Sequence, residues 1–215
     1  MPLNKQYTKE MLQCFGQNLM HKSTKGSDTM APALAHEKLY TIDDIYNLPD
    51  GSRAELIDGQ IYYMAPPNRK HQTIARELFS SINSYIKPKG CSCEPFFAPF
   101  AVFLDKDDKN YVEPDISVVC NPDKLTDKGC SGAPDWIIEI VSSSSRRMDY
   151  FTKLFKYRTA GVREYWIVDP DKKRITVYDF ESEDIKDYTF SDSVKVNIYG
   201  DLYINFSDIA ELLNI

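Results

Sequence analysis

Hydrophobic residues recur along the chain with the period of a helix in some stretches and that of a strand in others. The clearest helical stretch follows Pro66-Pro67-Asn68 and has an isoleucine or leucine at every fourth position, which places these side chains on one face. They are Ile74, Leu78, Ile82 and Ile86. Pro88 and Gly90 end the pattern, so the sequence predicts an amphipathic helix between these boundaries.

Three other segments are predicted to be helical. The first begins after Thr41, which can cap a helix, and ends at Pro49-Asp50-Gly51. The second covers about residues 146–159, and Gly161 stands where a left-handed residue commonly ends a helix. The third is short and closes the chain from Ser207.

Short apolar runs bounded by turn residues predict strands. They cover residues 93–97, 101–104, 115–120, 136–141, 164–168, 174–179 and 194–199. Residues 53–57 and 60–64 flank Asp58-Gly59, which is a signal for a two-residue β-hairpin. The order of the elements predicts an α/β or α+β fold in which helices flank one mixed β-sheet.

The chain is predicted to have one domain and an N-terminal extension. Residues 1–36 are polar and carry one weak helical pattern, formed by Leu12, Phe15 and Leu19. We expect this extension to be weakly structured. Residues 37–215 are enough for a single domain with a sizeable core.

Composition narrows the class of protein. Hydrophobic residues make up 42% and charged residues 27%, which is typical of a soluble globular protein. No apolar run approaches the roughly 18 residues of a membrane span, and no signal segment is apparent, so a cytoplasmic location is expected. The five cysteines are odd in number and their spacing fits neither a disulfide framework nor a zinc site, which predicts buried or idle thiols.

The formal net charge of −6 bears on nucleic-acid binding. Proteins that coat nucleic acid non-specifically rely on a basic surface, so this charge argues against that class. It leaves room for an enzyme in which a bound metal ion offsets several carboxylates locally.

Two acidic residues are candidates for a metal site. Glu139 stands in a strand that is apolar on both faces, which is typical of the middle of a covered sheet. A carboxylate buried there must be paired with a cation, protonated or bound to a metal, and a structural ion pair is the alternative to a functional site. Asp115 opens another buried strand after Pro114, and by itself an Asp at this place is more often a plain turn residue. Together, two carboxylates on neighbouring strands suit Mg²⁺.

The predicted helix after Glu139 adds a basic candidate. Asp149, Lys153 and Tyr157 are each four residues apart and therefore share one face. A solvent-exposed ion pair is the common alternative for such spacing. Because the helix directly follows the Glu139 strand, however, one of its faces must pack on the sheet close to Glu139.

His71 is the remaining candidate for chemistry. It precedes Ile74 by three residues and is interpreted as a core or capping histidine. The serines at 142–145 lack the glycines of a nucleophile elbow, so a Ser-His-Asp triad is not predicted.

Several motifs, taken in order, resemble the Uma-two family of restriction endonucleases, which is assigned to the PD-(D/E)XK nuclease superfamily. The similarity extends roughly over residues 40–180 and is carried by residues 113–116, 133–142, 147–157 and 161–169. Residues 53–59, residues 64–66 and His71 match the N-terminal pattern of the family. The resemblance implies a restriction-endonuclease-like core.

The resemblance also implies roles for single residues. Asp115 and Glu139 are the acidic pair of the family motif, and Glu55 is an additional acidic residue, so these three are the expected ligands of Mg²⁺ or Mn²⁺. The lysine usually found two residues after the second acid is replaced by Val141, and Lys153 on the following helix takes its part. Lys153 would stabilise charge on the phosphate or help to deprotonate water. The chain departs from the family at Ser142-Ser143-Ser144, usually Ser-Pro-Ser, and at the bulky Phe151.

The sequence therefore predicts an Mg²⁺-dependent endonuclease that hydrolyses phosphodiester bonds of nucleic acid, with DNA as the favoured polymer. A homodimer is expected, since cleavage of two strands calls for two sites, and no membrane is expected as a partner. The first alternative is a catalytically silent module that keeps the nuclease fold for binding or protein interaction. A metal-dependent hydrolase of another substrate is the second alternative.

Overall fold

The computed structural model describes residues 38–214, and the predicted N-terminal extension lies outside them. Six strands form a mixed sheet in the order β11-β10-β9-β8-β5-β3. The strands are β3 (Glu94–Phe97), β5 (Ile116–Val119), β8 (Trp136–Ile140), β9 (Glu164–Asp169), β10 (Arg174–Asp179) and β11 (Asp184–Thr189). Within this sheet, β8 and β9 are parallel and the other neighbours are antiparallel. The predicted mixed sheet flanked by helices is confirmed.

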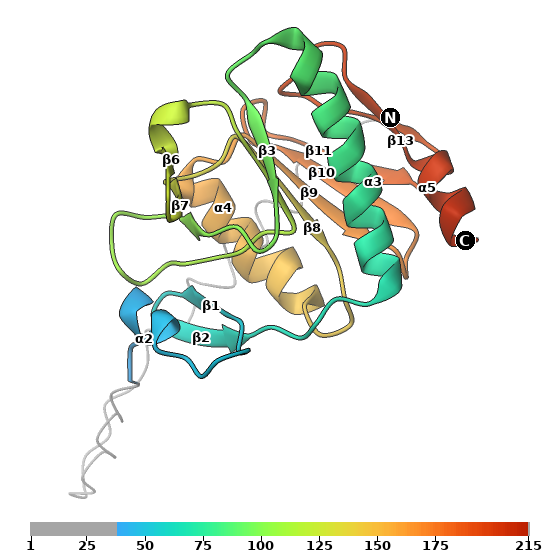
Figure 1. The fold of residues 1–215 in the computed structure, drawn as a ribbon. Coiled ribbons are helices and arrows are strands. Elements are labelled where there is room, and N and C mark those ends of the chain that lie inside the picture. The colour runs from blue at the N-terminus through green and yellow to red at the C-terminus, as the bar shows by residue number, and fades with distance from the viewer. Residues whose placement is uncertain (1–37, 215) are drawn as a thin grey trace, which may run out of the picture. The chain divides into compact units, whose positions relative to one another are not determined.

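Helices cover both faces of this sheet (Figure 1). On one face, the apolar stripe of α3 (Arg69–Ile86) packs with α5 (Phe206–Leu213) on side chains such as Ile138 and Trp166. On the other face, Tyr157 packs with Ile137, Tyr165 and Ile167. Neighbouring residues of β8 and β9 thus enter opposite cores, as the alternation of a buried strand requires.

The helix predicted over about residues 146–159 connects the parallel strands β8 and β9. It contains one turn of π-helix, η3 (Met148–Lys153), which runs into α4 (Leu154–Ala160). Gly161 ends it with a φ of 95°, so the predicted left-handed cap is confirmed. A crossover helix of this kind is the usual connection between parallel strands.

Smaller elements surround the main sheet. The predicted hairpin consists of β1 (Ala54–Ile57) and β2 (Gln60–Tyr63), joined at Asp58 and Gly59, which both have positive φ. Such a two-residue turn matches the twist of the hairpin. The other elements are α2 (Ile42–Tyr46), η1 (Lys87–Lys89), η2 (Pro122–Lys124), the small sheet of β4 (Val102–Phe103), β6 (Leu125–Thr126) and β7 (Gly129–Ser131), and the pair of β12 (Ser193–Lys195) and β13 (Tyr203–Asn205).

Some strand predictions need correction. The strand expected over residues 194–199 is the shorter β12, and its partner β13 was not predicted. The edge strand β11 was also missed, because most of its side chains are exposed and charged residues interrupt its apolar pattern. Within the described part of the chain, no helix is both long and apolar enough to cross a bilayer.

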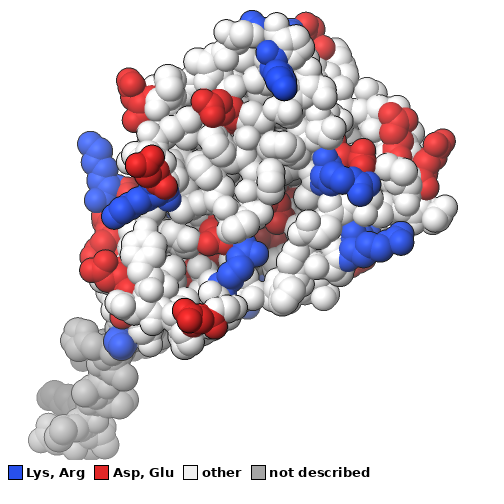
Figure 2. Space-filling model, in the orientation of Figure 1, with Lys and Arg blue, Asp and Glu red and all other residues white. Residues whose placement is uncertain are grey.

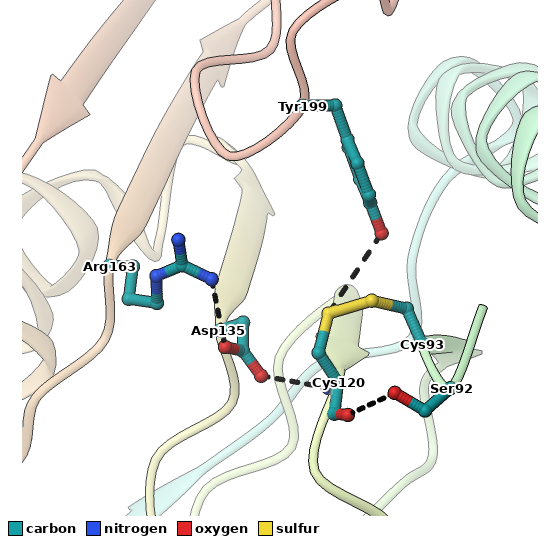
Figure 3. Close-up of a disulfide and its surroundings, with 6 residues drawn as sticks. All are labelled: Ser92, Cys93, Cys120, Asp135, Arg163 and Tyr199. Carbon is teal, nitrogen blue, oxygen red and sulfur yellow. Dashed lines mark hydrogen bonds and ion pairs between the residues drawn. A yellow bond between two sulfur atoms is a disulfide. The ribbon is translucent and has the colours of Figure 1, made fainter.

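The structure contains a disulfide between Cys93 and Cys120 (Figure 3). The antiparallel register of β3 and β5 pairs Glu94 with Val119, and continued by one residue it sets Cys93 opposite Cys120. The prediction of free thiols is therefore wrong for these two residues, since a sequence separation of 27 does not reveal a cross-strand pair. Cys91 and Cys130 are free thiols, and Cys14 lies outside the described residues.

Removal of this disulfide should lower stability measurably. The double substitution of Cys93 and Cys120 by serine is expected to reduce the free energy of unfolding by about 3 kcal/mol, because the unfolded chain loses a cross-link that closes a loop. Urea denaturation with and without a thiol reductant measures the change. Cys91→Ser is the matched control and should behave as the wild type. If reductant left the wild type as stable as before while its free-thiol count rose, the disulfide would have no stabilising role.

Candidate active site

A cleft of about 610 Å³ opens where the hairpin β1–β2, the first turn of α3, the end of β8 and the start of the η3 helix meet. Its lining includes the four predicted site residues together with His71 and Asp149. They are Glu55, Asp115, Glu139, Lys153, His71 and Asp149. Residues separated by up to about a hundred positions in the chain thus share one cleft.

Asp115 and Glu139 lie on neighbouring strands and face each other. Ile116 of β5 pairs with Ile138 of β8 in an antiparallel register, and continued by one residue it sets Asp115 opposite Glu139. Directly opposite residues of this kind have Cβ atoms about 5 Å apart and side chains on the same face. The two carboxylates therefore point toward the same region of the cleft.

The carboxylate of Asp115 is held by two hydrogen bonds on one oxygen. Its Oδ2 accepts the backbone N–H of Ile140 at 2.7 Å and lies 3.1 Å from Nε2 of His71. Oδ1 has no hydrogen bond to any residue between 38 and 214. His71 is thus a mostly buried histidine that contacts Asp115, and it does not cap the helix, since Asn68 provides the cap.

Lys153 lies at the centre of a buried cluster of acidic residues. Its side chain is only 5% exposed, and Nζ lies 2.8 Å from Glu55 and 2.9 Å from Glu139. A third carboxylate, Asp149, is 3.9 Å away, and its Oδ1 has no hydrogen-bond partner within the described residues. This burial excludes the alternative of a solvent-exposed Asp149–Lys153 pair.

The local helix geometry aims these side chains inward. Asp149 and Lys153 lie in the π-helical turn η3, and one turn later Tyr157 donates a hydrogen bond from Oη to Glu139 Oε1 at 2.7 Å. The shared face expected from their spacing thus packs on the sheet beside Glu139. Single π-helical turns are frequent at functional sites.

The cluster carries more negative than positive charge. Burial raises the pKa of Glu139 well above its ordinary value, and the nearby Lys153 ammonium only partly offsets this effect. Burial likewise raises the pKa of Asp149 to about 6. Burial by itself would lower the pKa of Lys153, but Glu139, Glu55 and Asp149 together raise it well above normal, so the ammonium stays protonated. One ammonium among three carboxyl groups supplies too little positive charge to keep them all ionised, and a bound cation would favour their ionised forms.

The donor set fits a hard divalent cation. The oxygens Asp115 Oδ1 and Glu139 Oε2 accept no hydrogen bond from residues 38–214. Mg²⁺ is commonly bound by one or two carboxylates and keeps several waters, so this pair suits it. Glu55, the expected third ligand, contacts Lys153 through both carboxylate oxygens and accepts the backbone N–H of Glu113. Among the described residues, no three acidic, histidine or cysteine side chains are grouped closely enough to form an all-protein metal site.

The surface around the cleft is mixed in charge. Figure 2 shows lysine and arginine side chains interspersed with aspartate and glutamate over this face, without an extended patch of one sign. Lys70 and Asp171 line the cleft and Arg146 approaches Asp171, and none of the three was predicted. Their separation along the chain gives no signal that they meet.

Comparison with known proteins places the chain among nuclease-like sequences. Residues 40–199 match the family model Uma2, described as "Putative restriction endonuclease". An uncharacterised protein of Synechocystis sp. is 25% identical over 150 residues, which cover 68% of this chain and 77% of that protein. The crystal structure of "a putative nuclease belonging to DUF820" from Anabaena variabilis superposes with a TM-score of 0.67 at 25% identity, covering 80% of this chain and 98% of that one.

Asp149→Asn should change how stability depends on pH. In the folded protein the pKa of Asp149 is about 6, above the ordinary value of 3.8, so between these values the folded state holds a proton that the unfolded chain has lost. Above the folded-state pKa, ionised Asp149 lowers the free energy of unfolding by its full amount. This destabilisation disappears as the pH falls below the unfolded-state pKa. From about pH 4 to about pH 7 the variant should gain about 3 kcal/mol relative to the wild type.

Urea unfolding across this pH range measures the difference. Asp192→Asn is the control, because hydrogen bonds from Thr189 lower the pKa of its exposed carboxyl, so the variant should show no such gain. Parallel stability curves for Asp149→Asn and the wild type would contradict the prediction.

Proposed function

The chain belongs to the Uma2 family, and from this premise we propose that it is a metal-dependent endonuclease that hydrolyses phosphodiester bonds of DNA. The observation that carries the proposal is the buried ammonium of Lys153, 2.9 Å from Glu139, beside a carboxylate pair with two oxygens that accept no hydrogen bond from residues 38–214. The excess negative charge of this cluster suits a cation, and the cation in turn suits a phosphate.

Asp115 and Glu139 hold Mg²⁺ or Mn²⁺ in this proposal. The hydrogen bonds from Ile140 and His71 fix the rotamer of Asp115 and leave Oδ1 for the ion. When bound, such an ion acidifies water and polarises the phosphate. His71 is then a positioning residue, because it acts through Asp115.

Lys153 supplies the positive charge that the PD-(D/E)XK motif usually places two residues after its second acid, where Val141 stands in this chain. Because the pKa of Lys153 is raised, the ammonium is protonated at neutral pH. It therefore stabilises the negative charge that develops on the phosphate and does not act as a base. Glu55 orients this ammonium from the hairpin and so supports the site without binding the ion.

The remaining predictions belong to the same proposal. Residues 37–215 form the nuclease domain, residues 1–36 are an extension, and two copies act as a homodimer on the two strands of DNA. A cytoplasmic location also remains a prediction. The Cys93–Cys120 bond is unusual for it, since the cytosol keeps most thiols reduced.

One observation favours the alternative of a silent module. Lys153 is fully paired with Glu55 and Glu139, as in a structural ion-pair network. In a purely structural network, substitutions would change stability alone. In an active site, they would abolish activity even in variants that remain folded.

Cleavage of supercoiled plasmid by purified protein with Mg²⁺ or Mn²⁺ tests the proposal. The wild type should nick the plasmid, and Asp115→Asn, Glu139→Gln and Lys153→Met should each reduce the rate by about 100-fold or more, the effect of losing charge stabilisation at a reacting phosphate. Removal of the metal by a chelator should abolish nicking by the wild type. Circular dichroism verifies that each variant is folded.

Lys89→Ala is the matched control, since Lys89 is an exposed lysine paired with Asp201 beyond the far end of α3. This variant should nick as the wild type does. Equal residual nicking by every protein would identify a contaminating nuclease. Absence of cleavage with either metal on any substrate offered would leave the silent module as the function.

A further inference from the structure

Three charged side chains from different elements meet at the mouth of the cleft. Lys70 lies in the first turn of α3, Arg146 precedes the η3 turn, and Asp171 lies in the turn between β9 and β10. Nζ of Lys70 is 3.7 Å from Asp171 Oδ1, and Nη2 of Arg146 is 3.6 Å from Asp171 Oδ2. One carboxylate thus lies between two cationic groups.

The guanidinium of Arg146 is held in place by a buried carboxylate. Its Nη1 pairs with Asp169, which is fully buried and also accepts a hydrogen bond from Tyr150. This contact leaves Nη2 directed toward Asp171. An arginine held in this way offers a donor whose position is set before any ligand arrives.

The position of Asp171 differs from that of Asp169. Its side chain is 56% exposed, and both of its ion pairs are longer than a hydrogen bond. Exposed pairs of this kind contribute little to stability. The carboxylate can therefore leave its place at low cost, whereas the buried Asp169 cannot.

We propose that Lys70 and Arg146 form a subsite for a backbone phosphate of the nucleic acid, next to the phosphate that is cleaved, and that the Asp171 carboxylate occupies this subsite until substrate displaces it. The inference rests on the proposed nuclease function. Lys70 and Asp171 line the same cleft as Asp115 and Glu139, and His71, the neighbour of Lys70, contacts Asp115. Arg146 is connected to this lining through its contact with Asp171.

The charges at the mouth match a phosphodiester. With Asp171 in place, two cations face the two carboxylates of Asp169 and Asp171, and when Asp171 leaves, one positive charge is unpaired. A phosphodiester carries one negative charge and offers two oxygens to the same donors. Lys172 and Lys173 follow Asp171 in its turn, and the first turn of α3 contains no acidic residue. The N-terminal end of that helix adds further positive potential.

Binding of a fluorescein-labelled duplex DNA oligonucleotide tests the subsite, with Ca²⁺ in place of Mg²⁺ to suppress cleavage. Lys70→Ala should raise Kd roughly fivefold and lower the slope of log K against log salt by about one, the signature of a lost phosphate contact. Asp171→Asn should act in the opposite direction and lower Kd several-fold, because the competing carboxylate is gone. Opposite effects of two exposed substitutions cannot arise from misfolding.

Lys89→Ala and Asp201→Asn are matched controls, because they remove the partners of another exposed Lys–Asp pair, beyond the opposite end of α3. Their Kd values and salt slopes should equal those of the wild type. If Lys70→Ala and Asp171→Asn shifted Kd no more than these controls, or both in the same direction, the subsite would be overturned. So would a wild type that binds no DNA.

The plasmid assay separates this outcome from failure of the proposed function. Cleavage by the wild type together with unchanged Kd values in both variants would retain the nuclease and reject the subsite. Binding with the expected opposite shifts, but no cleavage with any metal, would retain the phosphate site on a protein that is not a nuclease.

Discussion

The buried ammonium of Lys153 is the interaction on which the rest of this structure depends. It joins three parts of the fold, because Glu55 belongs to the hairpin, Glu139 to the central strand β8 and Lys153 itself to the crossover helix. Removing one partner of a buried ion pair typically costs about 3–5 kcal/mol, since the other charge is left uncompensated. The hairpin and the helix are therefore held on the sheet at the place where the cleft forms, and the geometry of the cleft is inseparable from the stability of the fold.

A purely structural ion pair would need only one carboxylate. Three carboxyl groups surround Lys153, and burial raises the pKa of Glu139 and of Asp149, which disfavours their ionised forms. Such a cluster disfavours folding at neutral pH, and burial of unbalanced charge is characteristic of sites that await a ligand. The π-helical turn that contains Asp149 and Lys153 also favours a functional site. The physical argument for a cation site is thus the imbalance of the cluster, and the family resemblance supports it independently.

Local patterns account for the parts of the fold that the sequence predicted. The stripe of α3, the Asp58-Gly59 turn and the cap at Gly161 each depend on residues close together in the chain. Burial of Glu139 could also be anticipated, because its strand is apolar on both faces. The Cys93–Cys120 bond, the contact of His71 with Asp115 and the meeting of Lys70 with Asp171 depend on register and packing between distant segments. No spacing rule predicts them, and the exposed edge strand β11 escaped because it lacks a buried face.

The net charge of −6 argues against a protein that coats nucleic acid non-specifically. Within the cleft, however, the acidic and basic side chains lie in different places. The floor holds the carboxylates of Asp115 and Glu139, which would repel a phosphate until a cation neutralises them. At the mouth, Lys70 and Arg146 share the exposed carboxylate of Asp171, which is easily displaced, while buried Asp169 stays paired with Arg146. Attraction for a phosphate can therefore be local and conditional, so a protein without a basic surface need not coat nucleic acid in order to act on it.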